Sequence, residues 1–213
     1  MKLSNKMNIK RFINCISVFV LISGLVVMVG WYLDIDFVKS FLPGAVTMKF
    51  STALCFSLSG LSLLFIARTI EGKTEVARWV LSNTSFTILL IMLTFLISTI
   101  MGLQTDLEVV FVTETEAVMT SLPGRPSLGT TLGFILIAFC GILVMINKEL
   151  SLKVLPILGA IVGFLGVLAI LGYLLNISLL YCYIEGLSTA MAFHTAALFI
   201  LLGLGLMFVV RIR

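Results

Sequence analysis

His194 is the single histidine of the chain. One imidazole does not suffice for a bis-histidine haem site or a dedicated zinc site, because each takes several protein ligands. Near Glu185, a partly buried His194 is instead expected to titrate close to neutral pH and to act as a proton sensor. A lone histidine beside a helix start also serves for capping or packing, and the sequence leaves both interpretations open.

Further polar residues recur at the ends of apolar blocks. A threonine enters three of the blocks, where its hydroxyl can bond the free N–H groups of a first helical turn. An aspartate or asparagine follows three others, and both residue types favour turns. Caps and turns are one interpretation, and a ring of polar groups around an outer pocket is the other. The candidate ligand-binding residues are His194, Thr195, Thr52, Thr130, Arg125, Glu185, Asp34, Asp106 and Asn176.

Motifs of catalysis are absent from the sequence. It holds no P-loop, no GxGxxG after a strand, no HExxH and no GxSxG. The central turns of the apolar blocks contain no Asp, Glu, Lys or Arg, which disfavours a proton-coupled transporter or a pump. The four cysteines show no CxxC spacing and are interpreted as small apolar residues. We therefore expect no enzyme activity, no cofactor and no metal.

Composition places the chain in a bilayer. Hydrophobic residues make up 60% of the 213 positions and charged residues only 11%, whereas soluble domains carry about a quarter charged residues. The mean hydropathy is +1.21. Each apolar block has close to the roughly 17–25 residues that cross a bilayer, and in lipid such blocks must be helices. The expected spans cover residues 12–33, 52–68, 79–102, 128–147, 153–175 and 193–210.

Basic residues indicate the orientation. They lie between the apolar blocks, so they do not point to nucleic acid as a partner. Eleven of the fourteen flank the spans on the side of the N-terminus, and only Lys39, Lys49 and Arg125 lie on the other side. The positive-inside rule therefore predicts a multi-pass cell-membrane protein with both termini in the cytoplasm. The first apolar run follows a basic start, like a signal peptide, but its length predicts a retained span.

Three segments of the sequence resemble one another. Residues 50–58, 128–136 and 193–201 share Thr at the third position and Phe at the seventh. Residues 30–35, 102–107 and 172–177 share Gly, then Asp or Asn four positions later, then Ile or Leu. The repeated unit is therefore predicted to be a helical hairpin. It is used three times within a single membrane domain of residues 1–213, approximately over 12–68, 79–147 and 153–211.

Parallel repeats of this kind are related by an axis along the membrane normal. The expected fold is an all-α membrane protein of six transmembrane helices in a pseudo-threefold bundle, with its outer loops meeting near the axis. Gly159 and Gly163 favour close helix contacts, either inside this bundle or in a homo-oligomer. The longest outer loop, residues 103–127, is expected to form an interfacial helix or flap that covers the axis or seals the bundle.

Residues 172–206 carry a pattern that resembles a known family. It comprises Gly172-Tyr173, Leu180-Tyr181, Thr189, the run Met191-Ala192-Phe193-His194-Thr195-Ala196 and residues 202–206. The pattern is similar to the last hairpin of the multi-span N-terminal sensor region of prokaryotic membrane histidine kinases and diguanylate cyclases. Residues 48–56 resemble the entry to the second helix of that region. The resemblance extends over residues 20–211, implies a sensory membrane module and assigns no ligand or site residue.

In such receptors a cytoplasmic output domain follows the last span, whereas this chain stops at Arg213. The sequence has no phosphoacceptor helix and no cyclase motif, so the chain is not expected to be a kinase. The favoured hypothesis is a stand-alone, non-enzymatic sensory or ligand-binding module that acts through a cytoplasmic or membrane signalling protein. A small passive transporter or channel and an accessory subunit of a membrane complex are the alternatives. A polar path along the axis favours a transporter, and an axis filled by Phe, Leu and Met favours a sensor.

Overall fold

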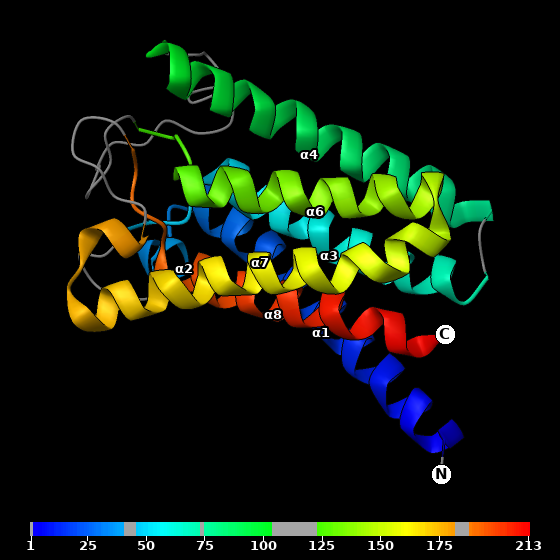
Figure 1. The fold of residues 1–213 in the computed structure, drawn as a ribbon. Helices are drawn as coiled ribbons and strands as arrows, with labels where there is room; N and C mark the ends of the chain where they lie inside the picture. The colour runs from blue at the N-terminus through cyan, green and yellow to red at the C-terminus, as the bar shows by residue number, and fades with distance from the viewer. Residues whose placement is uncertain (1, 41–45, 73–74, 104–122, 182–187) are drawn as a thin grey trace.

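Six long helices make up most of the computed structural model, which describes residues 2–40, 46–72, 75–103, 123–181 and 188–213 (Figure 1). All six are long and apolar enough to cross a membrane, in agreement with the six predicted spans. They are α1 (Lys2–Tyr32), α3 (Phe50–Ile70), α4 (Glu75–Met101), α6 (Leu128–Ile146), α7 (Lys148–Leu175) and α8 (Phe193–Val209). The shorter elements described are α2 (Asp36–Lys39), η1 (Ser178–Tyr181) and η2 (Val210–Ile212).

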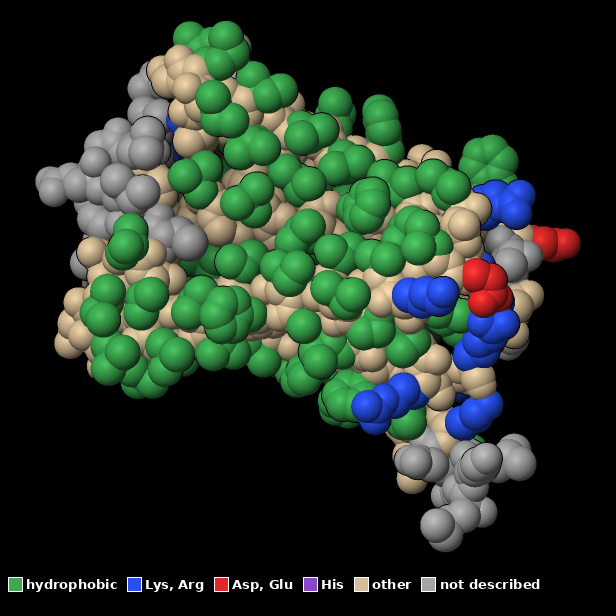
Figure 2. All heavy atoms as spheres, viewed as in Figure 1, with side chains coloured by type: hydrophobic (Ala, Val, Ile, Leu, Met, Phe, Trp, Pro, Cys, Tyr) green, Lys and Arg blue, Asp and Glu red, His purple; other side chains and the backbone are tan. Residues whose placement is uncertain are grey.

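Length and surface both suit a bilayer. The 19 residues of α6 extend over about 28 Å at 1.5 Å per residue, close to the roughly 30 Å of hydrocarbon. Hydrophobic side chains cover the middle of the face shown in Figure 2, whereas Lys, Arg, Asp and Glu gather at one end. Backbone groups in lipid must bond one another, and helices meet that requirement. The chain therefore has the features of a multi-pass membrane protein.

The six long helices form a closed ring in which three lie further inside. Helices α3 and α6 bury most of their length and α8 buries half, whereas α1, α4 and α7 bury less than half. Each long helix packs against the next one along the chain, and α8 returns to α1. Helix α3 also contacts α6 and α8. The core therefore lies where α3, α6 and α8 meet, and the other three helices cover it.

Both termini lie at the same end of the bundle (Figure 1), which we call the terminal end; the opposite end is the distal end. The Lys6 ammonium donates to the carbonyl oxygen of Arg213. Nearby, Lys10 lies 2.7 Å from a carboxylate oxygen of Glu71, and Arg213 lies 2.8 Å from Glu149. The Lys6 contact joins the first hairpin to the last at the terminal end, whereas the two ion pairs lie within the first and within the last hairpin.

A single residue joins α6 to α7 at the terminal end. The N–H of Asn147 donates to the carbonyl of Leu143 and so ends α6, at 2.9 Å. The side chain of Asn147 accepts from the N–H of Leu150 at 2.9 Å and so caps the start of α7. The two helices thus share one end residue, whereas α3 and α4 are separated by residues 71–74.

Glycines bring the helices of a hairpin into close contact. A Cβ on Gly60 would lie 2.6 Å from backbone atoms of α1. In the last hairpin, a Cβ on Gly159 would lie 2.8 Å from the carbonyl oxygen of Gly203, and one on Gly203 would lie 2.6 Å from the nitrogen of Gly163. The small residues at Gly159 and Gly163 therefore pack α7 onto α8 within the hairpin.

Candidate functional site

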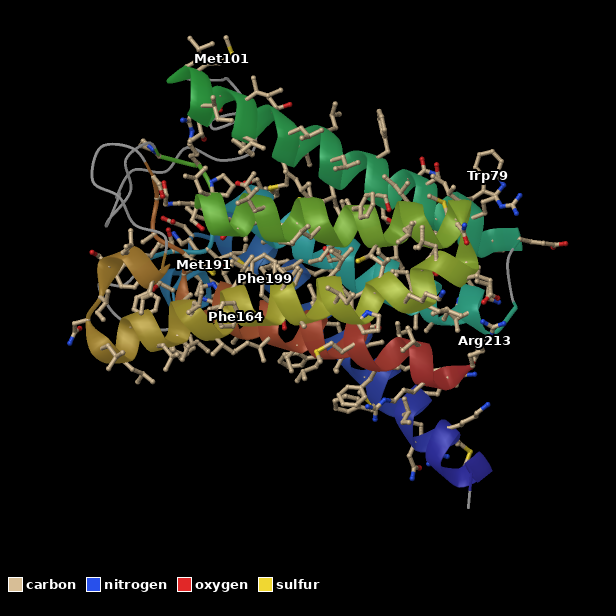
Figure 3. The ribbon with its side chains drawn as sticks, in the orientation of Figure 1. Trp79, Met101, Phe164, Met191, Phe199 and Arg213 are labelled. Atoms are coloured by element: carbon tan, nitrogen blue, oxygen red, sulfur yellow. The ribbon has the colours of Figure 1, made fainter. Side chains whose placement is uncertain are left out.

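Three phenylalanines meet where the inner helices converge. Phe56 of α3, Phe134 of α6 and Phe199 of α8 are each fully buried. Their ring centroids are 4.8 Å apart for Phe56 and Phe134, 5.0 Å for Phe134 and Phe199, and 5.1 Å for Phe56 and Phe199. Figure 3 marks Phe199 within the bundle. Rings at these separations attract one another and fill the space between the three helices; we call them the phenylalanine triangle.

The inner helices begin at one level above this triangle. Helices α3, α6 and α8 start at Phe50, Leu128 and Phe193, and each start precedes the triangle residue of its helix by the same interval. At 1.5 Å per residue that interval places the helix starts about 9 Å distal of the rings. A helix start offers free N–H groups and partial positive charge. Three of them at one level favour a group that accepts hydrogen bonds.

Threonines occupy the turn between these helix starts and the triangle. Thr52, Thr130 and Thr195 each lie four residues before a triangle phenylalanine, and residues at that spacing share a helix face. All three side chains are buried. The structure thus brings together three residues that the sequence singled out, one turn distal of the phenylalanine triangle.

Capping at the inner helix starts differs from the prediction that threonine hydroxyls would provide it. At α6 the cap is Ser127, whose Oγ accepts the N–H of Thr130 at 3.1 Å and lies 2.7 Å from its Oγ1. The residues at the corresponding positions of α3 and α8, Lys49 and Ala192, make no side-chain cap hydrogen bond. The threonines therefore lie inside the first turn of each inner helix and are not its N-cap residues.

Further buried polar side chains surround the threonines. They lie just before or within the first turns of the inner helices, and none exposes more than 8% of its surface. Within this group the hydroxyls of Ser51 and Thr189 have no hydrogen-bond partner among the described residues, and outside it the same holds for Ser59 and Ser85. Buried hydroxyls are normally satisfied, so the two in this group are free to bond a ligand or water. This distal polar cluster comprises Lys49, Ser51, Thr52, Arg125, Ser127, Thr130, Thr131, Ser188, Thr189, His194 and Thr195.

All three basic residues assigned to the outer side by sequence are buried: Lys39, Lys49 and Arg125 expose 6%, 3% and 3%. A buried cation requires partners, because its removal from water is otherwise costly. Arg125 donates through Nη2 to the carbonyl oxygen of Leu103 at 2.6 Å. This hydrogen bond ties the segment that enters α6 to the end of α4.

A turn that we call the first cap closes α1 onto the start of α3. Trp31 donates through Nε1 to the carbonyl of Met48 at 2.7 Å, and the N–H of Met48 donates to the carbonyl of Lys39 at 2.9 Å. The Lys39 ammonium lies 2.5 Å from Asp34, 2.8 Å from Asp36 and 5.1 Å from the Trp31 ring centroid. Burial acts to lower the pKa of Lys39, but its hydrogen bonds to both carboxylates outweigh burial and raise that pKa.

A matching turn, the third cap, closes α7 onto the start of α8. Tyr173 donates through its hydroxyl to the carbonyl of Met191 at 2.6 Å, and the N–H of Met191 donates to the carbonyl of Tyr181 at 2.8 Å. The two tyrosine rings stack with centroids 4.5 Å apart. The third cap thus repeats the hydrogen bonds of the first, with tyrosines at the positions of Trp31 and Lys39.

The two caps also end their outer helices alike. Asp34 and Asn176 adopt left-handed φ angles of 56° and 54°. In each case the next N–H reaches back to a glycine carbonyl, of Gly30 at 2.8 Å and of Gly172 at 2.9 Å. This bond satisfies one of the last carbonyls of the helix.

Helix α4 ends at a different point of the repeated pattern. Gly102 itself takes the left-handed φ, at 65°, and the N–H of Leu103 bonds the carbonyl of Ser98 at 2.9 Å. Gly102 therefore occupies the structural position of Asp34 and not that of Gly30. The sequence match of residues 102–107 with 30–35 is wrong by four residues, because a glycine favours both close packing and a left-handed helix end.

The nine predicted site residues fall into three groups. The threonines, His194 and Arg125 lie in the distal polar cluster, at the inner helix starts. Asp34 and Asn176 lie at exposed helix ends, and the Asp34 carboxylate, whose side chain is 91% exposed, pairs with Lys39. Asp106, Glu185 and the flap expected in the longest loop lie outside the described residues.

Sequence reasoning missed the anchoring role of Trp31 and Tyr173. A signal for it was present, because each residue directly follows the glycine of the repeated pattern. Met48 and Met191, which accept their hydrogen bonds, each stand two residues before an inner helix start. Neither methionine carbonyl has a sequence signature, since any residue supplies a carbonyl.

Comparisons with protein-family models, with curated proteins and with solved structures found no match. Within the described ranges, no three His, Cys, Asp or Glu side chains gather where they would hold a metal ion. The function of the distal polar cluster is therefore inferred from its own geometry.

Proposed function

We propose that this chain is a non-enzymatic sensory module of the cell membrane. It binds a small ligand that accepts hydrogen bonds at the distal polar cluster, and it acts through a signalling partner at the terminal end. The observation that carries the proposal is the ring of buried threonines directly above the phenylalanine triangle. A ligand reaches such a site from the distal side, and the phenylalanine triangle beneath it blocks passage through the bundle. The resemblance of residues 172–206 to sensor regions of membrane receptors supports the same class.

The proposal includes a pseudo-threefold bundle of three parallel hairpins. The nearly equal ring distances within the phenylalanine triangle support it, as do the inner helices that start at one level. The matched first and third caps support a common ancestral hairpin for those two units. The second hairpin shares the triangle and the helix start, and its outer helix ends on a glycine.

The proposed orientation places both termini in the cytoplasm. Lysines and arginines gather at the terminal end (Figure 2), and the positive-inside rule assigns such an end to the cytoplasm. The distal polar cluster then faces the outside of the cell. A ligand arriving from outside or from the outer leaflet meets the inner helix starts first.

Signal transfer requires two packings of the bundle that bind the ligand with different affinity. A ligand held by all three inner helix starts favours the packing in which those starts lie closest together. The phenylalanine triangle acts as the pivot, because its rings fill the space below the ligand. A change of spacing on the distal side then alters the spacing of the same helices at the terminal end.

A flux measurement separates this proposal from a passive transporter. The pure chain in liposomes is expected to pass ions and small solutes no faster than empty liposomes, because the triangle fills the path. The double variant Phe134→Ala and Phe199→Ala removes two of the three rings. Its flux tests whether the triangle is what blocks the path. Rapid flux through the unaltered chain would overturn the sensor proposal in favour of a transporter.

A capture experiment tests the signalling partner. A photo-reactive amino acid is placed at Arg211, which is exposed at the terminal end, and for comparison at Leu179, which is 67% exposed on the distal side. Cross-linked products from native membranes are identified by mass spectrometry. A histidine kinase or cyclase captured only from position 211 is the expected result. Capture of this chain alone, or of an unrelated complex, would sink the proposal, and an unrelated complex would point to an accessory subunit.

Valine substitutions test whether the threonines form the ligand site. Thr130→Val and Thr195→Val remove buried hydroxyls at nearly constant volume and are expected to change the yield of partner capture. Thr94→Val is the control, because the Thr94 hydroxyl is exposed and bonds the Leu90 carbonyl of its own helix at 2.8 Å. Equal yields from all three variants would remove the distal polar cluster from the proposal.

A further inference from the structure

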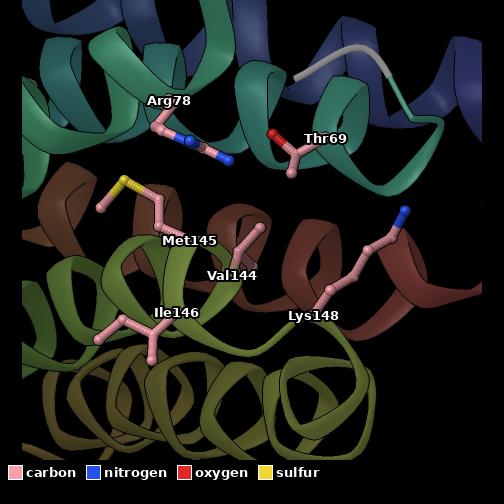
Figure 4. Close-up of a pocket in the computed structure, with 6 residues that line it drawn as sticks. All are labelled: Thr69, Arg78, Val144, Met145, Ile146 and Lys148. Atoms are coloured by element: carbon pink, nitrogen blue, oxygen red, sulfur yellow. The ribbon is translucent and has the colours of Figure 1, made fainter. Parts of the chain in front are cut away.

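A hollow opens at the terminal end, away from the distal polar cluster (Figure 4). Its volume is about 210 Å³, many times the roughly 10–15 Å³ that holds one water molecule. Four helices contribute to it: the end of α3, the first turn of α4, the end of α6 and the first residue of α7. Its lining residues are Thr69, Arg78, Val144, Met145, Ile146 and Lys148.

Two cationic side chains flank this hollow from different helices. Figure 4 shows Arg78 and Lys148 on either side of Thr69. Neither forms an ion pair within the described part of the chain. Of the nearby acids, Glu71 pairs with Lys10 at 2.7 Å and Glu149 with Arg213 at 2.8 Å, whereas the exposed Glu75 of the first turn of α4 forms no ion pair within the described residues.

The floor of the hollow is apolar, and its surroundings are those of a membrane interface. Val144, Met145 and Ile146 supply hydrocarbon beneath the two cations. Trp79, directly after Arg78, is 76% exposed and projects from α4 in Figure 3. Tryptophan at such a position is typical of the boundary between hydrocarbon and lipid headgroups.

We propose that this hollow binds the phosphate of an anionic phospholipid, with Arg78 and Lys148 holding the headgroup and the apolar floor meeting the start of the acyl chains. Arginine binds phosphate oxygens through two N–H groups, and lysine adds a compact positive charge. Basic pockets between membrane helices on the cytoplasmic side take such headgroups. The two cations and the apolar floor of the hollow thus match the headgroup and the acyl chains of one amphipathic ligand. This site is separate from the proposed sensory function and does not depend on it.

The test uses the full chain in nanodiscs of phosphatidylcholine with a few mole per cent phosphatidylglycerol. Native mass spectrometry measures how much phosphatidylglycerol each protein retains. Arg78→Gln and Lys148→Gln are each expected to weaken retention about fivefold, and the double variant more strongly. Arg78→Lys keeps the charge and is expected to restore most of the binding. The matched control is Lys153→Gln, an exposed lysine of α7 that does not line the hollow, and it is expected to bind like the unaltered chain.

A second arm separates lipid from free phosphate. Inorganic phosphate is titrated onto the chain in pure phosphatidylcholine nanodiscs, and the unfolding temperature is recorded. No rise is expected, because free phosphate lacks the acyl chains that meet the apolar floor; a rise that disappears in the double variant would assign the site to soluble phosphate and overturn the lipid proposal. Retention of phosphatidylglycerol by the double variant at the unaltered level would overturn it as well. So would an equal loss in Lys153→Gln, since that result would reflect the net surface charge alone.

Discussion

The first and third caps have the same backbone contacts and different side-chain chemistry. In both, an aromatic residue of the outer helix donates to a methionine carbonyl, and the methionine N–H returns to the short turn. In the first cap the residue beneath the aromatic ring is Lys39 with two carboxylates, and in the third it is Tyr181. The comparison teaches that the hydrogen bonds to the backbone define the cap. The side chains that fill it are free to be ionic or aromatic.

The largest test of this comparison replaces the glycines on which the caps close. In Gly172→Ala, the new Cβ would lie 2.8 Å from the Leu180 Cβ and 3.0 Å from the Ile177 carbonyl oxygen. In Gly30→Ala it would meet the Val38 side chain at 2.6 Å. Overpacking of this kind costs about 1–3 kcal/mol, with the larger loss expected at Gly172 because a backbone atom cannot swing aside.

The measurement for both glycine variants is the temperature of unfolding. Unfolding is detected as the onset of maleimide labelling at Cys55 and Cys140, which are buried in the folded chain. Gly72→Ala is not a suitable control, because Gly72 has a φ of 94°. A suitable one is Ala160→Ser, at an exposed position of α7. Unaltered unfolding temperatures for both glycine variants would show that the caps rearrange freely and would break the comparison.

The next test removes the aromatic donors. Trp31→Phe and Tyr173→Phe each take away the hydrogen bond to a methionine carbonyl, and a net loss of about 1 kcal/mol is expected from each. If the caps are equivalent, the two losses are of similar size, although Trp31→Phe also loses ring volume. Tyr32→Phe is the control, since Tyr32 is 88% exposed. A loss at only one of the two caps would mean that the shared hydrogen bonds do not have a shared role.

Salt and pH sharpen the contrast between the two caps. The pKa of Lys39 is raised in the folded chain above 10.5, so its pairing stabilises the fold below that value. This contribution is lost as the pH rises through the folded pKa, and added salt weakens it at lower pH. Because both carboxylates are exposed, the contribution is expected to be about 0.2–1 kcal/mol.

The measurement compares the unfolding temperature of Lys39→Met with that of the unaltered chain from pH 8 to pH 11. The difference is expected to shrink toward the alkaline limit and in high salt. Lys153→Met accounts for the general effect of removing an exposed lysine. A difference that stays constant with both pH and salt would mean that Lys39 acts by packing against Trp31 alone.

The smallest effect is expected at the left-handed residues. Asn176→Gly is expected to change stability by no more than about 0.5 kcal/mol, because glycine adopts a positive φ without strain. Asp34→Gly gains the same freedom and loses the carboxylate that pairs with Lys39 at 2.5 Å, so it should be the less stable of the two variants. The unfolding temperatures of the two variants give the comparison directly. The reverse order would show that the Asp34 carboxylate does not stabilise the first cap.

The helices were predictable because apolar runs of membrane length admit one backbone solution. The predicted span 128–147 differs from α6 by one residue. The start of α7 was placed at 153 and lies at Lys148, since Lys148, Glu149 and Ser151 lower the hydropathy but remain helical. Polar residues at the ends of a membrane helix extend beyond the hydrocarbon, so hydropathy alone underestimates helix length.

The candidate site was predictable in its repeated threonines and in two single residues, His194 and Arg125. Thr52, Thr130 and Thr195 shared a spacing to phenylalanine, and that spacing placed them on one helix face in each unit. Ser51 and Thr189 had no such sequence signal. Their hydroxyls lack a hydrogen-bond partner because the neighbouring helices place no donor or acceptor beside them, and a local sequence pattern does not show this. The hollow at the terminal end is likewise lined by residues from four helices, and no local sequence pattern predicts that these residues come together.

The joint at Asn147 has a mechanical consequence. Asn147 both ends α6 and caps the start of α7, so no flexible linker separates the two helices and their relative movement is restricted. We expect α6 and α7 to move together at this joint, and so to couple the second hairpin to the third. If α6 tilts about the phenylalanine triangle, we expect the start of α7 to move with it. The lining of the hollow would then change shape, because Ile146 and Lys148 stand on either side of that joint.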